Sequence, residues 1–408
     1  MTASGGALAG IRILDLSRVL AGPACTQLLG DLGAEVIKIE RPGVGDETRG
    51  WGPPFVKDAQ DADSSESGYY LCCNRNKRSV AIDMSKPEGL ALIKRFLERS
   101  DVLIENFKVG GLAKYGLSYD ALRDEFPGLI YCSITGYGQT GPYAERPGYD
   151  MIAQAMGGLL SMTGEPDRPP SKVPVAINDV MTGMYAAVAI LAALRHRDAT
   201  GAGQHIDLAL LDVQVAWLYN QGLNYLTGGD IPERMGTAHP NSVPYQVFES
   251  ADGFILLGAN NDAQFTRFCA FVGREDLLQD PRFATNADRV RNRDAIVAEV
   301  QKIVRQKPSA YWIAELAAIN VTCGPINTID KVFADPQIVD REMKISMPHA
   351  AAGSGAVDLI GNPVKLSGTP VSYRMPPPML GEHTDAVLED VLGLDESSIA
   401  SLRSGGVI

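Results

Sequence analysis

IRILDLSRVLAGPACTQLLGDLGAEVIKIE, residues 11–40, places two apolar runs on either side of a segment with helix signals. The first run, residues 11–17, is short and largely apolar, as expected of a buried strand. Pro23 fits the first turn of a helix that extends to Leu32, because an N–H group has no partner at that position anyway. Residues 35–40 form a second strand-like run. The stretch therefore predicts the strand–helix–strand unit from which parallel sheets are built.

The same alternation continues along the first third of the chain. The segments SVAIDM (79–84), DVLIENF (101–107) and GLIYCSITGYG (128–138) each resemble a buried strand. Pro87 begins a helical pattern after the first of them, with apolar residues recurring at roughly helical spacing. Strands separated by helices require right-handed crossovers and a mostly parallel sheet. We therefore expect an α/β, Rossmann-like half.

The pattern changes after about residue 247, where VFESADGFILLG has an Asp-Gly turn signal between two apolar runs, typical of a hairpin. Polar helical patterns follow through about residue 330. Because 408 residues exceed the size at which one hydrophobic core stops growing, two domains are the default expectation. We expect the second domain to be smaller and of α+β type.

Composition excludes several classes of protein. Apolar residues make up 45% and charged residues 21%, which is typical of a globular chain. The formal net charge of −12 argues against a nucleic-acid partner, because phosphate backbones attract basic surfaces. None of the six cysteines falls in a C-x-x-C pair and the five histidines are scattered, so we expect no metal site.

The chain also has no evident membrane or export signal. MTASGGALAG, residues 1–10, lacks the basic start and apolar run of a signal peptide. The longest apolar run, 184–194, is shorter than the roughly 20 residues that span a bilayer. We expect a cytoplasmic protein with reduced cysteines and no membrane partner.

Basic residues near the predicted strand ends are candidates for an anion site. A dinucleotide site is disfavoured, because the turn SRVLAGPACTQ lacks the G-x-G-x-x-G fingerprint although Glu40 ends the second strand. Arg41 follows that strand, where open α/β sheets bind ligands. Arg75, Lys77 and Arg78 form either part of the same site or a solvated charged loop.

The stretch PVAINDVMTGMYAA, residues 174–187, places Asp179 before an apolar helical pattern. Aspartate is a favoured helix N-cap, where its carboxylate accepts backbone N–H groups. The same carboxylate, ionised at neutral pH, is also a candidate for catalysis. From the residues alone both interpretations stay open. The glycine-rich loop GYGQTGPYAERPGYD (136–150) fits close approach of a ligand, although a tyrosine in such a loop is more often a packing residue.

A resemblance resolves the choice. The chain resembles the class III CoA-transferases, which include formyl-CoA and carnitine CoA-transferases and the α-methylacyl-CoA racemases. The resemblance covers nearly the whole chain and rests on motifs in order, namely LAGPACTQLLGDLGAEVIKIERPGVGD, NRNKRSVAIDM, DVLIENF, ITGYGQTGP, GYDMIAQAMGG, AINDVMTGMYAA, TGAGQHIDLALLD, CGPINT and PMLGEHT.

The resemblance implies an intertwined homodimer of interlocked rings, each chain threading through the other. It implies a large Rossmann-like CoA-binding domain formed by residues 1–200 and by a C-terminal return at 331–408. A linker at 201–224 leads to a small domain at 225–330.

It also implies which residues act. Asp179 matches the family's catalytic aspartate. Val109 replaces the usual proline of the E-N-F-x-P-G motif, and MGTAHPNSVPY (235–245) occupies the place of a glycine-rich loop of formyl-CoA transferase, so formyl-CoA and oxalate are disfavoured as substrates. The coenzyme A contacts carried over from the family are Leu20, Ala21, Arg41, Ile82, Asp83, Met84, Ser85, Asn106, Phe107, Lys108, Lys114, Thr135, Gly136, Tyr137 and Gly138.

The resemblance leaves three activities to weigh. The racemases use a histidine followed by aspartate where this chain has Tyr149 and Asp150, and a tyrosine with an unperturbed pKa of about 10 is a poor proton carrier. CoA transfer from a donor such as succinyl-CoA to a dicarboxylic acid is therefore favoured, with racemisation as the alternative and non-catalytic CoA binding as a second. Candidate acceptors are hydroxymethylglutarate, malate, itaconate and mesaconate. Arg234, His239 and Asn241 are candidates for holding the distal carboxylate of the acceptor, and a plain surface loop is the competing interpretation.

Overall fold

A computed structural model describes residues 6–408, which divide into two compact units. The first unit comprises residues 6–157, 174–217 and 336–408, and the second comprises 158–173 and 218–335. The domain bounds expected from the sequence stay a prediction. Residues 158–173, which were expected in the large domain, lie with the second unit.

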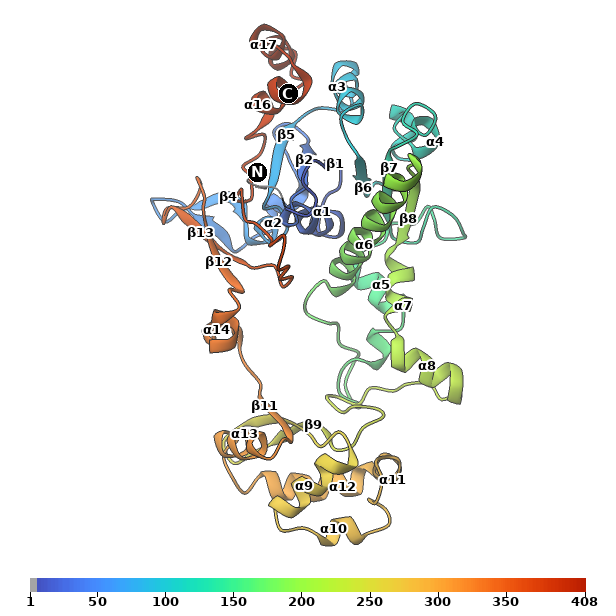
Figure 1. Cartoon of the computed structure of the whole chain (residues 1–408), viewed down its shortest axis with the longest axis vertical. Coiled ribbons are helices and arrows are strands. Elements are labelled where there is room, and N and C mark those ends of the chain that lie inside the picture. The colour runs from blue at the N-terminus through green and yellow to red at the C-terminus, as the bar shows by residue number, and fades with distance from the viewer. Residues whose placement is uncertain (1–5) are drawn as a thin grey trace. The chain divides into compact units, whose positions relative to one another are not determined.

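A six-stranded parallel sheet forms the centre of the first unit (Figure 1). Its strand order is β5-β2-β1-β6-β7-β8, and every neighbouring pair is parallel, which confirms the expected α/β fold with a parallel sheet. The order reverses between β1 and β6, the position at which open α/β sheets bind ligands beyond the carboxyl ends of their strands. The strands are β1 (Arg12–Asp15), β2 (Glu35–Glu40), β5 (Lys77–Ala81), β6 (Val102–Glu105), β7 (Ile130–Thr135) and β8 (His205–Ala209).

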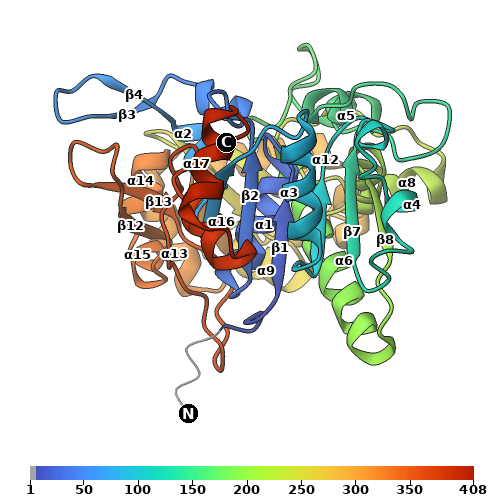
Figure 2. The same ribbon diagram turned by 90° about the horizontal axis from the view of Figure 1, so that it is seen from above.

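Helices cover both faces of this sheet. Ile13, Val36 and Ile104 pack on one face against α1 (Ala21–Asp31) and α6 (Ile177–Thr200). The intervening residues Leu14 and Ile37 point to the other face, because side chains alternate along a strand. Figure 2 shows α3 (Pro87–Leu97), α16 (Thr384–Leu392) and α17 (Glu396–Ser404) on that second face.

Helix α6 contains the apolar run 184–194 and extends beyond it at both ends. Its 24 residues are long and apolar enough to cross a membrane by length and composition, and it is the one such helix among residues 6–408. In the first unit it packs on the sheet and on α1 through Ala186, Ala187 and Ile190. Its opposite side exposes Met184 and Val188.

The C-terminal segment returns to the first unit and binds β5 and the turn that follows it. The N–H of His383 donates to the Ser79 carbonyl (2.9 Å), and the Thr384 hydroxyl accepts the N–H of Ala81 (3.0 Å). Further along, the N–H of Asp83 donates to the carbonyl of Val407 (2.8 Å). The last helices therefore complete the β5 edge of the sheet. The other elements of this unit are η1 (Glu47–Gly50), β3 (Phe55–Lys57), β4 (Asp63–Ser67), α2 (Gly68–Leu71), η2 (Ala113–Tyr115), α4 (Tyr119–Leu122), α5 (Asp150–Met156), α7 (Leu210–Ala216), α15 (Pro336–Asp340), β12 (Lys344–Pro348) and β13 (Ala356–Ile360).

The second unit is built on a three-stranded antiparallel sheet in the order β11-β10-β9. The predicted hairpin is confirmed as β9 and β10, joined through a turn in which the N–H of Ser250 donates to the Gly253 carbonyl (2.8 Å). Its own core includes Phe248, Ile255 and Phe265. The elements of this unit are η3 (Leu160–Met162), α8 (Tyr219–Gly228), β9 (Tyr245–Glu249), β10 (Phe254–Gly258), α9 (Asp262–Phe271), α10 (Asp276–Gln279), α11 (Asn286–Arg291), α12 (Arg293–Val304), α13 (Ser309–Ala318), β11 (Thr322–Pro325) and α14 (Ile329–Ala334).

Candidate functional site

The structure brings the predicted coenzyme-binding segments to one edge of the parallel sheet. The carboxyl ends of parallel strands meet at the same edge, so residues that follow different strands become neighbours. Arg41 follows β2, residues 82–85 follow β5, residues 106–108 follow β6, Thr135 ends β7 with residues 136–138 after it, and Leu20 and Ala21 begin α1 after β1. Lys114 lies in η2, with its ammonium 4.6 Å from the centre of the Tyr115 ring.

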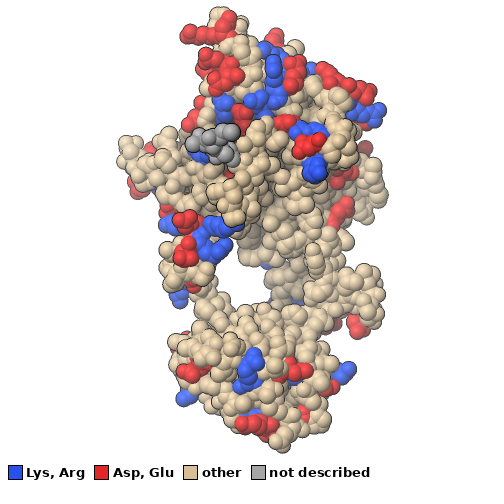
Figure 3. Space-filling view, viewed as in Figure 1, with Lys and Arg blue, Asp and Glu red and all other residues tan. Residues whose placement is uncertain are grey.

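Two cations at this edge are free to bind an anion. Arg41 and Lys108 are exposed, and within residues 6–408 neither side chain forms a hydrogen bond or ion pair. On the face drawn in Figure 3, Lys and Arg side chains lie interspersed with Asp and Glu. An anion at this edge would therefore be recognised by individual basic side chains within an acidic protein.

The basic cluster at residues 75–78 has neither of the two roles considered from the sequence. Arg75 is buried and its guanidinium forms an ion pair with Asp31 (2.6 Å). Lys77 is fully buried, and its ammonium donates to the Asn74 side chain (2.9 Å). Arg78 forms ion pairs with Glu35 (3.2 Å) and Asp390 (3.0 Å). Because β5 begins at Lys77, these side chains are drawn into the packing of the sheet.

Asp179 lies in the first turn of α6 but is not its cap. The N-cap residue is Ala176, and no side chain caps the helix from that position. Asp179 is half-buried, and within the described chain no group donates a hydrogen bond to its carboxylate. The capping interpretation of Asp179 is therefore wrong. A carboxylate from another helix takes that role, because Asp150, at the start of α5, accepts the N–H of Asn178 (2.8 Å).

The surroundings of Asp179 make its carboxylate basic. Burial and the nearby charge of Asp150 raise the pKa of Asp179 to about 7. Burial and the charge of Asp179 raise the pKa of Tyr69 to about 12, so this phenol keeps its proton at neutral pH. Tyr69 packs edge-on against Trp51, with ring centres 5.0 Å apart. The site thus combines a weakly solvated carboxylate with a neutral phenol.

The first turns of α6 touch the start of α1. A Cβ added at Gly183 would lie 2.6 Å from the carbonyl oxygen of Ala21, so glycine is required where the two helices cross. Gly183 lies one helical turn after Asp179. The candidate nucleophile and two predicted coenzyme contacts, Leu20 and Ala21, therefore belong to the same helix crossing.

The loop after β7 reaches the same region. A Cβ added at Gly136 would lie 2.5 Å from the Cα of Gly148, so the predicted segment 135–138 packs directly on the residues that precede Asp150. The hydroxyl of Thr135 accepts the N–H of Gly138 (2.9 Å) and fixes this turn. Tyr149, which occupies the place of the racemase histidine, is 65% exposed.

A cavity of about 430 Å³ lies behind the turn after β6 and is lined in part by Glu105, Lys108 and His205. The buried Glu105 carboxylate accepts the N–H of Phe107 (2.8 Å), and its burial raises its pKa to about 7. Ser133 and His205 continue the polar contacts, with their side chains 3.0 Å apart. Glu105 therefore fixes the backbone of the predicted coenzyme segment 106–108 through its hydrogen bond to Phe107.

The three candidate acceptor residues lie in the second unit. The Arg234 guanidinium donates to the carbonyls of Glu165 and Pro166 (3.2 and 3.1 Å), and the His239 ring stacks on Tyr245. The Asn241 side chain accepts a hydrogen bond from that of Asn224 (3.0 Å). Their role toward an acceptor stays a prediction.

Four features of the site do not follow from the sequence. They are the role of Asp150 beside Asp179 and the places of Tyr69, Trp51 and Glu105. The tryptophan in TRGWGPP (48–54) was the available signal, since a large aromatic residue among turn residues is uncommon on a plain surface. Within residues 6–408, no group of three or more His, Cys, Asp and Glu side chains is placed to hold a metal ion.

Comparison with known proteins gives consistent matches along the chain. A family model described as CoA-transferase family III matches residues 8–384. A succinate–glutarate CoA-transferase from Agrobacterium fabrum is 47% identical over 395 residues, covering 96% of this chain and 97% of the relative. A human succinyl-CoA:glutarate CoA-transferase is 43% identical, covering 98% of this chain and 90% of the relative.

Solved structures agree with these matches. A crystal structure of a CaiB/BaiF family protein from Brucella suis has a TM-score of 0.83 and 46% identity, covering 95% of this chain and 100% of that chain. A structure of Rv3272 from Mycobacterium tuberculosis, in a mutant form, also has a TM-score of 0.83, with 30% identity and coverage of 95% and 99%.

Proposed function

The chain belongs to CoA-transferase family III and is a CoA-transferase, and from this premise we propose that it moves CoA from succinyl-CoA to a dicarboxylic acid of about the length of glutarate. Two relatives above 40% identity are named for succinate or succinyl-CoA together with glutarate. A more distant one, 38% identical and from Haloarcula hispanica, is named as a succinyl-CoA:mesaconate CoA-transferase. These names support a dicarboxylate acceptor over a racemisation.

Asp179 is the proposed nucleophile. Its carboxylate attacks the thioester carbonyl, a C–O bond forms, the C–S bond breaks, and a mixed anhydride and the CoA thiolate result. The thiolate then attacks the Asp179 carbonyl of the anhydride, which releases succinate and leaves an aspartyl-CoA thioester. The acceptor carboxylate attacks that thioester to form a second anhydride, and the thiolate attacks the acceptor carbonyl to give the product and free Asp179. No water or net proton is consumed.

One observation carries this proposal, the Asp179 carboxylate without a hydrogen-bond donor within residues 6–408, beside the Asp150 charge. A carboxylate held by its own helix would be stabilised as a ground-state ion and would attack poorly, whereas one that is poorly solvated is a stronger nucleophile. The neutral Tyr69 phenol supplies a donor for the oxyanion that develops on the attacked carbonyl.

Coenzyme A is bound, in this proposal, by the segments at the carboxyl edge of the sheet. Arg41 and Lys108 supply cations for its phosphates, because a guanidinium matches phosphate oxygens in pairs and an ammonium acts as a point charge. Leu20 and Ala21 contact the part of the acyl-CoA that lies next to Asp179. The remaining contacts are those carried over by resemblance, at residues 82–85, 106–107, 114 and 135–138.

The test uses succinyl-CoA, ¹⁸O-labelled glutarate and mass spectrometry. The mechanism passes one glutarate oxygen to Asp179 and, in the next turnover, from Asp179 to released succinate. We expect glutaryl-CoA and singly labelled succinate from the wild type, and neither from Asp179→Asn. Asp212→Asn, which changes an exposed first-turn aspartate of α7, is the matched control and should behave as the wild type. Glutaryl-CoA formed with unlabelled succinate over many turnovers would contradict the mechanism. Exchange of the α-proton without any acceptor would instead support the racemase.

We also propose the homodimer implied by the resemblance. Met184, Val188 and Leu191 expose apolar side chains on the side of α6 that faces away from its own sheet. A continuous apolar helix side of this kind is typical of a surface covered by a partner. Light scattering should give the mass of two chains, and Val188→Glu should shift that mass toward one chain.

A further inference from the structure

Val19 occupies a backbone conformation that its side chain disfavours. Its φ is +70°, in the left-handed region, which β-branched residues adopt only when the surroundings enforce it. The residue lies between β1 and α1, at the point where the strand order of the sheet reverses. Leu20 and Ala21 follow it directly, so the conformation of Val19 sets the direction in which the chain enters α1.

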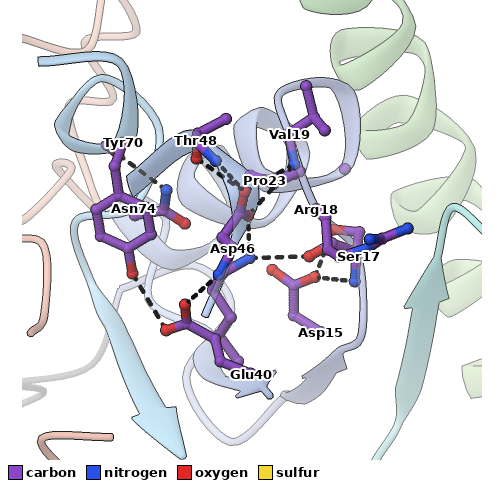
Figure 4. Close-up of polar contacts among 12 residues, drawn as sticks. Asp15, Ser17, Arg18, Val19, Pro23, Glu40, Asp46, Thr48, Tyr70 and Asn74 are labelled. Carbon is purple, nitrogen blue, oxygen red and sulfur yellow. Dashed lines mark hydrogen bonds and ion pairs between the residues drawn. The ribbon is translucent and has the colours of Figure 1, made fainter. Parts of the chain in front are cut away.

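Side chains from three separate segments accept hydrogen bonds from consecutive N–H groups of this loop, and Figure 4 shows two of them, Asp15 and Asp46. The N–H of Ser17 donates to the Asp15 carboxylate at 2.9 Å. The N–H of Arg18 donates to the Asn106 side chain at 2.9 Å. The N–H of Val19 donates to both carboxylate oxygens of Asp46, at 3.2 and 3.3 Å. Asp46 is thus the group that holds the N–H of the strained residue.

Asp46 is itself held by Lys38, whose ammonium lies 2.9 Å from a carboxylate oxygen of Asp46. Both side chains have no exposed area. The same ammonium donates to the carbonyl of Ser17 at 2.8 Å, so Lys38 also binds the loop directly. Lys38 and hydrogen bonds from Thr48 lower the pKa of Asp46 to about 2, and the ion pair therefore persists across the neutral range.

The hydrogen bonds that hold the loop stop at Val19, and the predicted coenzyme contacts begin with the next residue, Leu20. Within residues 6–408, the N–H groups of Leu20, Ala21 and Gly22 have no hydrogen-bond partner, and the start of α1 has no side-chain cap. Ala21 lies against Gly183 of α6, one turn from Asp179. A change at Val19 would therefore move the coenzyme contacts relative to the nucleophile.

We propose that the buried Lys38–Asp46 pair is a positioning device that holds Val19 in its left-handed conformation and so fixes Leu20 and Ala21 for binding of the acyl-CoA. This inference rests on the proposed function. A buried ion pair contributes little net stability compared with apolar residues of similar size, so its value here lies in fixing one loop geometry. The positioning acts on binding, through backbone geometry, and leaves the Asp179 carboxylate unchanged.

The test first breaks the Lys38–Asp46 ion pair and then relieves the backbone strain at Val19. In Asp46→Asn we expect the dissociation constant of free CoA, measured by calorimetry, to rise at least tenfold, with the KM for succinyl-CoA rising in parallel. Adding Val19→Gly to that variant should restore at least half of the lost affinity on a logarithmic scale, because glycine adopts the left-handed region without a steric cost. Adding Val19→Ala should not restore it.

Two further variants keep the test decisive. Asp31→Asn breaks a different buried ion pair, that of Asp31 with Arg75, without touching Val19, and should bind CoA as tightly as the wild type. If Asp46→Asn does not fold, Val19→Pro applies the same test, because proline excludes the left-handed region and lacks the N–H. Unchanged CoA affinity in Asp46→Asn or in Val19→Pro overturns the inference, as does equal rescue by glycine and alanine. A wild type that neither binds CoA nor transfers it overturns the proposed function instead.

Discussion

Replacing Asp179 by asparagine should abolish CoA transfer and, at the same time, stabilise the fold. The pKa of this carboxyl rises from 3.8 to about 7 in the folded chain, so its ionisation is harder in the folded state than in the unfolded state. A raised carboxyl pKa means that the charge lowers stability at high pH and that this penalty fades as the pH falls through 7 toward 3.8. Asparagine has the same shape and carries no such penalty.

The size of the effect follows from the two pKa values. At pH 8 the charged Asp179 lowers the free energy of unfolding by up to about 4 kcal/mol relative to a neutral side chain. At pH 5, where the folded carboxyl is protonated, the same linkage gives about 1.7 kcal/mol. These values are upper limits, because Asp179 is half-buried and water screens part of the charge.

Urea unfolding of the wild type and Asp179→Asn at pH 8 and pH 5, at one protein concentration, measures this difference. We expect a higher midpoint for the variant at pH 8 and a smaller gain at pH 5. The control Asp212→Asn changes an exposed aspartate at a comparable helix position and should shift the midpoint little at either pH. A variant no more stable than the wild type at pH 8, or a gain that grows at pH 5, would refute the reasoning.

Three other predictions concern activity. The kcat/KM for succinyl-CoA should rise with pH and reach half its maximum near pH 7. Asp150→Asn removes the neighbouring charge and should move that midpoint to lower pH. An unmoved midpoint would show that Asp150 does not act on Asp179. Gly183→Ala places a Cβ 2.6 Å from the Ala21 carbonyl oxygen. We therefore expect the free energy of unfolding to fall by about 1–3 kcal/mol and kcat to decrease. An unchanged free energy of unfolding would argue against a tight α1–α6 crossing. If Arg234 holds the distal acceptor carboxylate, Arg234→Ala should raise the KM for glutarate at least tenfold and leave the dissociation constant of CoA unchanged, and an unchanged KM would assign Arg234 to the Glu165 and Pro166 carbonyls alone.

Much of the large unit could be predicted from the sequence because its signals are local. Residues 11–40 show strand, helix and strand in succession, and Pro23 and Pro87 mark helix starts that the structure confirms at α1 and α3. The strand order could not be predicted in this way, because the position of β6 beside β1 depends on contacts between segments about 90 residues apart. The helical crossovers predict that the strands are parallel, but they do not predict that the strand order reverses between β1 and β6.

In the site, too, local features could be predicted and contacts between distant segments could not. Residues after strands were correctly expected at one sheet edge, because position in a strand–helix repeat fixes that edge. The environment of Asp179 was not predictable, since the carboxylate that caps α6 comes from Asp150, 28 residues before Asn178. The burial of Arg75 and Lys77 does not follow from the sequence, because a charged run is usually exposed and their buried partners Asp31 and Asn74 become neighbours only in the fold.

The return of the C-terminus to β5 has a consequence for how the chain is made. A ribosome releases residues 218–335, with their own core, before the segment that closes the first unit has been synthesised. The N–H of Asp83 donates to the carbonyl of Val407, and the Lys86 ammonium donates to the carbonyls of Gly405 and Gly406, and all three carbonyls are synthesised after the second unit. The turn at residues 82–85 is therefore completed only after residues 218–335 have been synthesised, and a chain cut before Gly405 would lack these contacts at its predicted coenzyme edge.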